Sequence, residues 1–290
     1  MKLLIAIVLM ALTALPAGAE LIRRSKGSFK LEAALGGKRV EQEVYYCGPR
    51  RIKSDTRVVI VMHGNQRNAD DYRDAWEGHA EEEDLLVLVP EFSERDFPGS
   101  SDYNLAGMVS SSGAFKPRKD WAFPLIDNLF SAVKKDQELD AEKFYLYGHS
   151  AGAQFVHRYA MFHGSPLLGL AISANAGWYT FPSAQERFPY GLGQMPAPFD
   201  GKRVFATNLI ILLGSSDTDP NHKHLRKTEE ALRQGVNRLE RGKNFFESAK
   251  MAAKEQGVGL SWSVSVVPNV GHSNSGMSKA ALKVITSTKI

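Results

Sequence analysis

One serine stands between two glycines, directly after an apolar run of the sequence. The segment from Gly148 to Gly152 reads Gly-His-Ser-Ala-Gly, which matches the pattern G-x-S-x-G. It follows the apolar run Phe-Tyr-Leu-Tyr and precedes an amphipathic helical pattern, so we expect a sharp strand-to-helix turn. Such a turn lifts the hydroxyl to the top of a sheet and directs a helix N-terminus at the same place. We therefore predict that Ser150 is a nucleophile; the alternative is a small residue that only completes a turn.

A serine hydroxyl is a weak nucleophile, so it needs a base, and the base needs an acid that orients it. Asp217 and His272 each come just past an apolar run, and the chain order is serine, aspartate, histidine. All three residues then lie at carboxyl ends of predicted parallel strands, where open α/β sheets bind ligands. Asp219 lies close enough to compete with Asp217. We prefer Asp217, because Pro220 biases Asp219 toward an extended conformation that leads away.

A third segment, His63-Gly64-Asn65, ends an early apolar run before a helical pattern. Backbone N–H groups at this place, together with that of Ala151, would stabilise the negative charge that develops on the substrate oxygen. We predict the amide of Asn65 as the donor, with Gln66 as the less favoured choice. The alternative is an ordinary strand-to-helix loop.

Short apolar runs alternate with helical patterns along most of the chain. The expected strands are "SFKLEAAL" and "KRVEQEVYYC", joined at Gly36-Gly37 as an antiparallel pair, followed by Arg57–Gly64, Leu85–Phe92, Lys143–Ser150, Leu168–Gly177, Asn208–Asp217 and Leu260–His272. The expected helices are Ala69–Glu83, Trp121–Asp136, Ala151–His163, Gly242–Gln256 and Met277 to about Thr286. Most of the later runs are continuously apolar, as in strands that are covered on both faces. The pattern predicts one α/β domain over residues 20–290, with a mostly parallel, doubly wound sheet, an antiparallel N-terminal strand pair and helices on both faces.

Two long connections interrupt this alternation, Ser93–Lys119 and Trp178–Arg203. Long loops inside a compact domain are often functional, although they can also be plain surface excursions. The second loop is rich in aromatic residues, which would line a cleft over the carboxyl edge of the sheet. We predict Trp178 and Tyr179 as substrate-binding residues.

Other polar clusters have simpler interpretations. His149 adjoins the nucleophile, and its side chain should point away from that of Ser150. His222 and His224 form an H-x-H pair without nearby ligands, and the segment from Asp217 to Thr228 lacks the glycine and glutamate of a calcium loop. We therefore predict no metal and no cofactor.

The first 19 residues have the layout of a secretory signal peptide, with Lys2, an apolar run from Leu3 to Leu15, and small residues Ala17 and Ala19. We predict export to the periplasm or outside the cell after cleavage at Ala19, because the run is shorter than a membrane span needs. Removing Lys2 lowers the net charge of +4 to +3, which predicts no nucleic-acid partner. The one cysteine, Cys47, cannot form an internal disulfide and is expected to be packed.

The motifs H-G-N, G-H-S-A-G, G-x-x-D and V-G-H, in this order, resemble the α/β-hydrolase superfamily over nearly the whole chain after residue 19. More narrowly, the chain resembles secreted single-domain esterases related to poly(3-hydroxyalkanoate) depolymerases and feruloyl esterases. The resemblance implies Ser150, Asp217 and His272 as a triad, with Asn65 and Ala151 as oxyanion donors.

These observations predict a serine hydrolase that cleaves a small or oligomeric carboxylic ester through an acyl-enzyme. A peptidase or acyltransferase is the nearest alternative, since the same triad serves any acyl transfer. A non-catalytic binding protein on the same scaffold is disfavoured, because each catalytic position holds a competent residue. Nothing in the sequence indicates the oligomeric state.

Overall fold

The computed structural model describes residues 20–196 and 198–290. The predicted signal peptide, residues 1–19, lies outside the described residues. Within the described ranges, none of the helices combines the length and apolar character needed to span a membrane.

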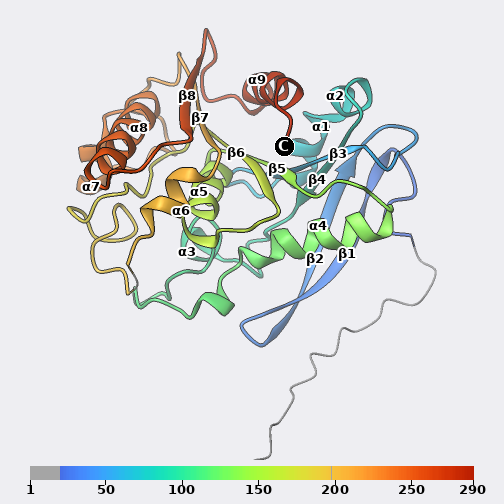
Figure 1. Cartoon of the computed structure of the whole chain (residues 1–290), viewed down its shortest axis with the longest axis horizontal. Coiled ribbons are helices and arrows are strands. Elements are labelled where there is room, and N and C mark those ends of the chain that lie inside the picture. Colours follow the sequence, from blue (N-terminus) through green and yellow to red (C-terminus); the bar gives the residue numbers. More distant parts are fainter. Residues whose placement is uncertain (1–19, 197) are drawn as a thin grey trace, which may run out of the picture.

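An eight-stranded sheet runs through the molecule in the order β1-β2-β4-β3-β5-β6-β7-β8 (Figure 1). The strands are β1 (Lys26–Leu35), β2 (Lys38–Cys47), β3 (Arg57–Met62), β4 (Leu85–Pro90), β5 (Phe144–His149), β6 (Leu168–Ala174), β7 (Leu209–Gly214) and β8 (Trp262–Val267). β1 pairs antiparallel with β2, and β2 pairs antiparallel with β4. All other neighbouring pairs are parallel. This arrangement confirms the predicted fold class, and it brings the carboxyl ends of β3, β5, β6, β7 and β8 to the same edge of the sheet.

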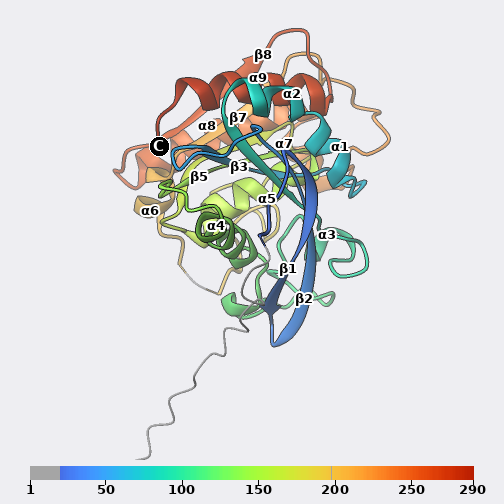
Figure 2. The ribbon, with the colours of Figure 1, turned by 90° about the vertical axis from the view of Figure 1, so that its right-hand side faces the viewer.

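Helices cover both faces of this sheet, as Figures 1 and 2 show together. On one face lie α1 (Ala69–Asp74), α2 (Glu77–Glu82) and α9 (Asn274–Ser287). On the other lie α4 (Pro124–Asp136), α5 (Ala151–Arg158), α6 (Gly201–Ala206) and α8 (Arg238–Glu255). The remaining elements are α3 (Gly99–Asp102), α7 (Glu229–Gln234), a 3₁₀ turn at Arg118–Asp120 and a π-helical turn at Tyr159–His163 that continues α5.

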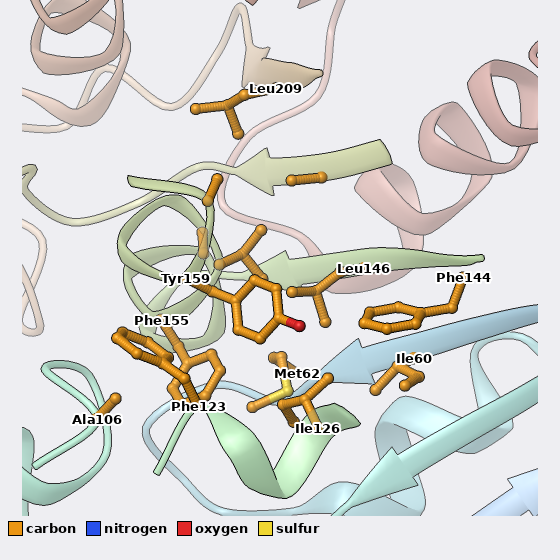
Figure 3. Packing of buried hydrophobic residues seen from close by; sticks show 14 of the residues in the cluster. Ile60, Met62, Ala106, Phe123, Ile126, Phe144, Leu146, Phe155, Tyr159 and Leu209 are labelled. Atoms are coloured by element: carbon orange, nitrogen blue, oxygen red, sulfur yellow. The ribbon is translucent and has the colours of Figure 1, made fainter. Parts of the chain in front are cut away.

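The core has two parts because successive strand side chains point to opposite faces. Ile60 and Met62 of β3 pack among the helices α4 and α5, whereas Val59 and Val61 belong to the cluster under α1, α2 and α9. Figure 3 shows the first cluster, in which the aromatic ring of Phe155 lies beside other buried rings. Burial on both faces explains the continuously apolar strands of the sequence.

The helix boundaries differ from the sequence expectation at α8, which begins at Arg238 and not at Gly242. The side chain of Asn237 caps the helix by accepting a hydrogen bond from the backbone N–H of Glu240 (2.9 Å). Asparagine followed three residues later by glutamate is a helix-start pattern. The extra turn is important because it carries Arg238 into the functional site.

Candidate active site

Ser150 occupies the sharp turn between β5 and α5. Its backbone angles are φ 58° and ψ −111°, a region that non-glycine residues rarely adopt. The backbone N–H of Ser150 donates to the carbonyl oxygen of Ala174 at the end of β6 (3.0 Å). The turn is therefore held against the sheet in a strained conformation, as a nucleophile elbow requires.

The two glycines of the motif are needed because the backbone passes close to its neighbours. A Cβ atom on Gly152 would lie 2.6 Å from the carbonyl carbon of Met62 and 2.7 Å from the carbonyl oxygen of His63. A Cβ atom on Gly148 would lie 2.7 Å from Cγ2 of Val156 and closer still to the backbone of Gly152. Glycine at both positions lets α5 start directly against the end of β3.

The structure brings Ser150, His272 and Asp217 into one hydrogen-bonded chain. His272 Nε2 lies 3.0 Å from Ser150 Oγ, and His272 Nδ1 lies 2.8 Å from Asp217 Oδ2. The side chain of His272 is 15% exposed and that of Asp217 is 3% exposed. Because a carboxylate only accepts hydrogen bonds, Nδ1 carries the proton in the neutral ring, and Nε2 can accept the proton of the serine.

Asp219, the alternative acid, does not take part in this chain. It is exposed, and its Oδ1 accepts a hydrogen bond from the backbone N–H of Asn221 (2.8 Å), which shapes the local turn. Asp217 is the carboxylate that the structure places at His272.

Asn175 ties the loop of Asp217 to the loop of His272. Its side chain accepts a hydrogen bond from the N–H of Gly214 (2.7 Å) and donates one to the carbonyl oxygen of Gly271 (3.0 Å). Its side chain is buried, so both hydrogen bonds are shielded from water. The sequence analysis missed this residue, although its position directly after an apolar run was a usable signal.

Asn65 and Ala151 both line a cleft of about 350 Å³, and Ser150 lines the same cleft. Across residues 20–196 and 198–290, the backbone N–H groups of Asn65 and Ala151 donate no hydrogen bond. Gln66, the less favoured choice, is not among the lining residues of this cleft. Two unpaired amides beside a serine hydroxyl are the donors that a developing oxyanion needs.

The loop that carries Asn65 is held by a buried histidine. His63 Nε2 accepts a hydrogen bond from the backbone N–H of Phe92 (2.9 Å), and Nδ1 donates to the carbonyl oxygen of Gly64 (2.9 Å). Burial lowers the pKa of His63 to about 4, so the ring is neutral near pH 7 and can donate one hydrogen bond while it accepts the other. Arg67 fastens the same loop to the carbonyl oxygens of residues 97 and 99.

Two further histidines pack against the ring of His272. The ring centre of His149 lies 4.6 Å from that of His272, and the ring of His222 stands edge-on to it at 5.3 Å. Burial, reinforced by His272 and Arg238, holds the pKa of His149 well below its usual range. Burial and Arg238 also lower the pKa of His222. Both neighbours are therefore neutral at pH 7 and leave His272 without a second positive ring beside it.

Arg238 is a member of this group that the sequence analysis did not single out. Its Nη1 lies 3.2 Å from Asp217 Oδ1, and both side chains are almost fully buried, at 1% and 3% exposed. Nη2 lies 3.1 Å from His222 Nδ1. No sequence motif announces this contact, because it depends on where α8 docks.

Trp178 lines the cleft, but Tyr179 does not, which corrects the prediction that both residues bind substrate. Tyr179 is fully buried, and its ring stacks on that of Phe245 of α8 at 4.5 Å. The two neighbouring side chains thus have different surroundings, and Trp178 is the one that lines the cleft. The guanidinium groups of Arg158 and Arg226 both lie over the ring of Trp178, 4.3 and 5.0 Å from its centre.

Positive side chains line the rim of the cleft on the segment from Lys223 to Arg226. In the part of the chain that the structure describes, neither Lys223 nor Arg226 forms a salt bridge, whereas Glu94 in the same cleft pairs with Arg67 (3.1 Å). The rim thus carries an uncompensated positive charge. The sequence analysis missed this role because it considered the segment only as a metal-binding candidate.

No metal-binding group is apparent among residues 20–196 and 198–290, since no three His, Cys, Asp or Glu side chains gather closely enough to hold an ion. His222 contacts Arg238, whereas His224 lines the cleft, so the two histidines of the H-x-H pair lie in different environments.

Comparison with solved structures finds close similarity over nearly the whole chain. The poly(aspartic acid) hydrolase-1 from Sphingomonas sp. KT-1 is 40% identical, with a TM-score of 0.86, over 91% of this chain and 99% of that one. The poly(3-hydroxybutyrate) depolymerase LpqC from Bordetella parapertussis is 31% identical, with a TM-score of 0.82, over 91% of each chain. An S-formylglutathione hydrolase from Agrobacterium tumefaciens shares the fold, at 15% identity and a TM-score of 0.55, over 90% of this chain and 93% of that one. No family model and no curated protein sequence matches this chain.

Proposed function

Because the chain belongs to the α/β-hydrolase superfamily of serine hydrolases, we propose that it cleaves carboxylic esters through an acyl-enzyme on Ser150. The observation that carries the proposal is the continuous chain from Ser150 Oγ to His272 Nε2 and from His272 Nδ1 to Asp217, at 3.0 and 2.8 Å. A strained turn presents the serine at the mouth of a cleft, and two unpaired amides accompany it.

The reaction proceeds in two halves. His272 Nε2 takes the hydroxyl proton while Ser150 Oγ attacks the acyl carbon, and the amides of Asn65 and Ala151 bind the resulting oxyanion. The imidazolium then gives its proton to the leaving alkoxide, which departs as the alcohol. Nε2 then takes a proton from a water molecule that attacks the acyl-enzyme, and it returns this proton to Ser150 Oγ as the bond to the acyl carbon breaks and the acid is released. Asp217 accepts the Nδ1–H throughout and stabilises the imidazolium without taking up its proton.

The positive rim supports an acyl substrate that carries negative charge. In the described chain neither Lys223 nor Arg226 has a carboxylate partner, and the guanidinium of Arg226 lies over the ring of Trp178, 5.0 Å from its centre. Cationic clefts concentrate anionic substrates and raise their rate of association at low ionic strength.

The same rim favours a second candidate function, the hydrolysis of amide bonds in an anionic polymer. The similar chain from Sphingomonas is named as a hydrolase of poly(aspartic acid), which is a polyanion joined by amides. The triad chemistry is the same for both, except that His272 protonates a leaving amine, so substrate preference separates the two candidates.

Labelling with a fluorophosphonate probe tests the proposal for the nucleophile. Ser150→Ala should abolish labelling and ester hydrolysis while the fold persists, because a triad member contributes about 10⁴–10⁶-fold to kcat. Ser261→Ala, at an exposed position of the same chain, serves as the matched control and should label like the wild type. Undiminished labelling of Ser150→Ala would remove this residue from the mechanism and favour a binding protein or another nucleophile.

A substrate panel then separates the candidates. A neutral p-nitrophenyl ester, a singly anionic ester and poly(aspartic acid) should be compared by kcat/KM at low and high salt. We expect the anionic ester to be preferred, with a preference that shrinks as salt screens the rim. Cleavage of poly(aspartic acid) with negligible esterase activity would favour the amide alternative, and transfer to an added amine or alcohol in place of water would favour an acyltransferase.

Export is a separate proposal and rests on the sequence of residues 1–19 alone. The intact mass of the exported protein should correspond to a chain that begins at Glu20. Recovery of the full-length chain in the membrane fraction would instead indicate an uncleaved anchor.

A further inference from the structure

Arg238 bridges the orienting acid of the triad and a histidine beside the base. Its guanidinium reaches Asp217 Oδ1 with Nη1 and His222 Nδ1 with Nη2, at 3.2 and 3.1 Å. A guanidinium has donors only, so His222 Nδ1 is the acceptor and carries no proton. This contact fixes the ring of His222, which packs steeply inclined to the ring of His272, at 67° and with the ring centres 5.3 Å apart.

The first turn of α8 holds this arginine rigidly relative to Asp217. The side chain of Asn237 accepts the N–H of Glu240 (2.9 Å) and donates to the Glu240 carboxylate (3.2 Å), which locks the helix start. The backbone N–H of Leu239 donates to the carbonyl oxygen of Asp217 (3.3 Å). Asp217 is therefore held by α8 through its main chain as well as through the carboxylate.

The charge balance of the buried group follows from these contacts. With His272 neutral, Asp217 and Arg238 compensate each other, and a proton on His272 would leave a net positive charge on a group of three side chains of which two are almost fully buried. Without the arginine, protonation would produce a neutral imidazolium–carboxylate pair. The other titratable or charged groups that face this cluster are His149 from β5, His222 and Asp219 from the loop after β7, Tyr179 from the loop after β6, and Arg241 from α8.

We propose that Arg238 is a positioning residue of the triad, which anchors one oxygen of Asp217 so that the other receives His272 and which places a buried positive charge beside the base. This inference rests on the proposed function. Arg238 thus becomes a fourth member of the hydrogen-bonded chain of Ser150, His272 and Asp217. If Oδ1 of Asp217 had no such partner, the carboxylate could rotate and Oδ2 would move away from His272. In this proposal His222 is an uncharged ring that packs against His272, and it is not a metal ligand.

The test is the pH dependence of fluorophosphonate labelling, which needs no knowledge of the substrate. Arg238→Gln removes the charge and keeps a donor. Its labelling rate at the plateau should fall by at least about tenfold, and by less than the roughly 10⁴-fold expected when the acid itself is lost. The acidic limb of its profile should move to higher pH by about one unit, since a nearby charge changes such midpoints by this order.

Arg241→Gln is the matched control. Arg241 is equally buried on the same helix, but it donates only to the backbone carbonyls of Gly235 (2.9 Å), Gly177 (2.6 Å) and Arg226 (2.9 Å). Its replacement should lower stability and move the acidic limb by much less than Arg238→Gln does, because Arg241 does not contact Asp217. The proposal is overturned if the acidic limb of Arg238→Gln lies at the same pH as that of the wild type. It is also overturned if Arg241→Gln moves the limb as far as Arg238→Gln does.

Arg238→Lys covers the case in which the glutamine variant fails to fold. Lysine keeps the charge but cannot bridge two acceptors with a planar fork, so the limb should stay in place while the plateau rate falls several-fold. A plateau equal to that of the wild type would overturn the bridging role. A wild-type protein that the probe does not label would instead refute the proposed function itself, which separates the two failures.

Discussion

Gly152 is the residue whose replacement most directly tests how the site is built. Its missing side chain allows α5 to start against the end of β3, with Met62 C and His63 O at 2.6 and 2.7 Å from the place of a Cβ atom. The carbonyl oxygen of Met62 lies closer still, and ordinary contact begins at 3.4 Å. Gly152→Ala therefore requires the two backbone segments to separate by more than the 3.4 − 2.6 = 0.8 Å that the Met62 carbonyl carbon alone demands. Neither segment is a flexible side-chain end, so the strand and the helix must separate.

This separation moves the two oxyanion donors apart, because Ala151 is on α5 and Asn65 is on the loop after β3. A displacement of about 1 Å in a catalytic geometry costs roughly 10²-fold in rate. Overpacking costs about 1–3 kcal/mol, from which the better helix propensity of alanine recovers up to about 1 kcal/mol. We therefore expect kcat/KM to fall by about two orders of magnitude and the free energy of unfolding to fall by about 1–2 kcal/mol.

The assays are hydrolysis of a neutral chromogenic ester and thermal unfolding of the same preparation. Gly78→Ala is the control, since Gly78 is an exposed helical glycine with no atom within 4 Å of a Cβ position. That variant should keep full activity and gain up to about 1 kcal/mol of stability. If Gly152→Ala stays within threefold of the wild-type rate, the close approach of α5 and β3 is not what assembles the oxyanion site.

Three further outcomes follow from the described contacts. Asp217→Asn should reduce kcat by about 10⁴-fold, because asparagine favours the wrong histidine tautomer, whereas Asp219→Asn should lose less than about tenfold; kcat on the same ester for both variants decides between them. Asn175→Ala should lower the free energy of unfolding by about 1–3 kcal/mol in denaturant titration, since it leaves the buried N–H of Gly214 without an acceptor. Burial raises the pKa of Cys47 to about 12, so its thiol stays protonated below that pH, and iodoacetamide at pH 8 should alkylate it only in unfolded protein.

The sequence predicted the parts of the site that depend on local pattern. Ser150, Asp217 and His272 each follow an apolar strand, and the fold class comes from the alternation of such strands with helices. The preference for Asp217 over Asp219 came from the chain direction that Pro220 imposes, and the structure brings Asp217 to His272.

The parts that depend on packing could not be predicted in this way. Arg238 reaches Asp217 only because α8 docks its first turn beside the end of β7, and no short motif encodes that contact. Tyr179 was assigned to the cleft because aromatic residues on a loop suggest a binding surface. The bend after β6 instead places its ring in the core against Phe245.

The position of β8 has a consequence for how the protein loses function on heating. Among the described strands β8 pairs only with β7, at the edge of the sheet, and most of its side chains are partly or fully exposed. His272, the proposed base, follows this strand and lies 122 residues away from Ser150, the proposed nucleophile. Edge elements open locally at a lower free energy than the centre of a sheet. If β8 detaches reversibly, His272 moves away from Ser150 while the central strands remain folded. The loss of catalytic activity should therefore begin below the temperature at which the core unfolds.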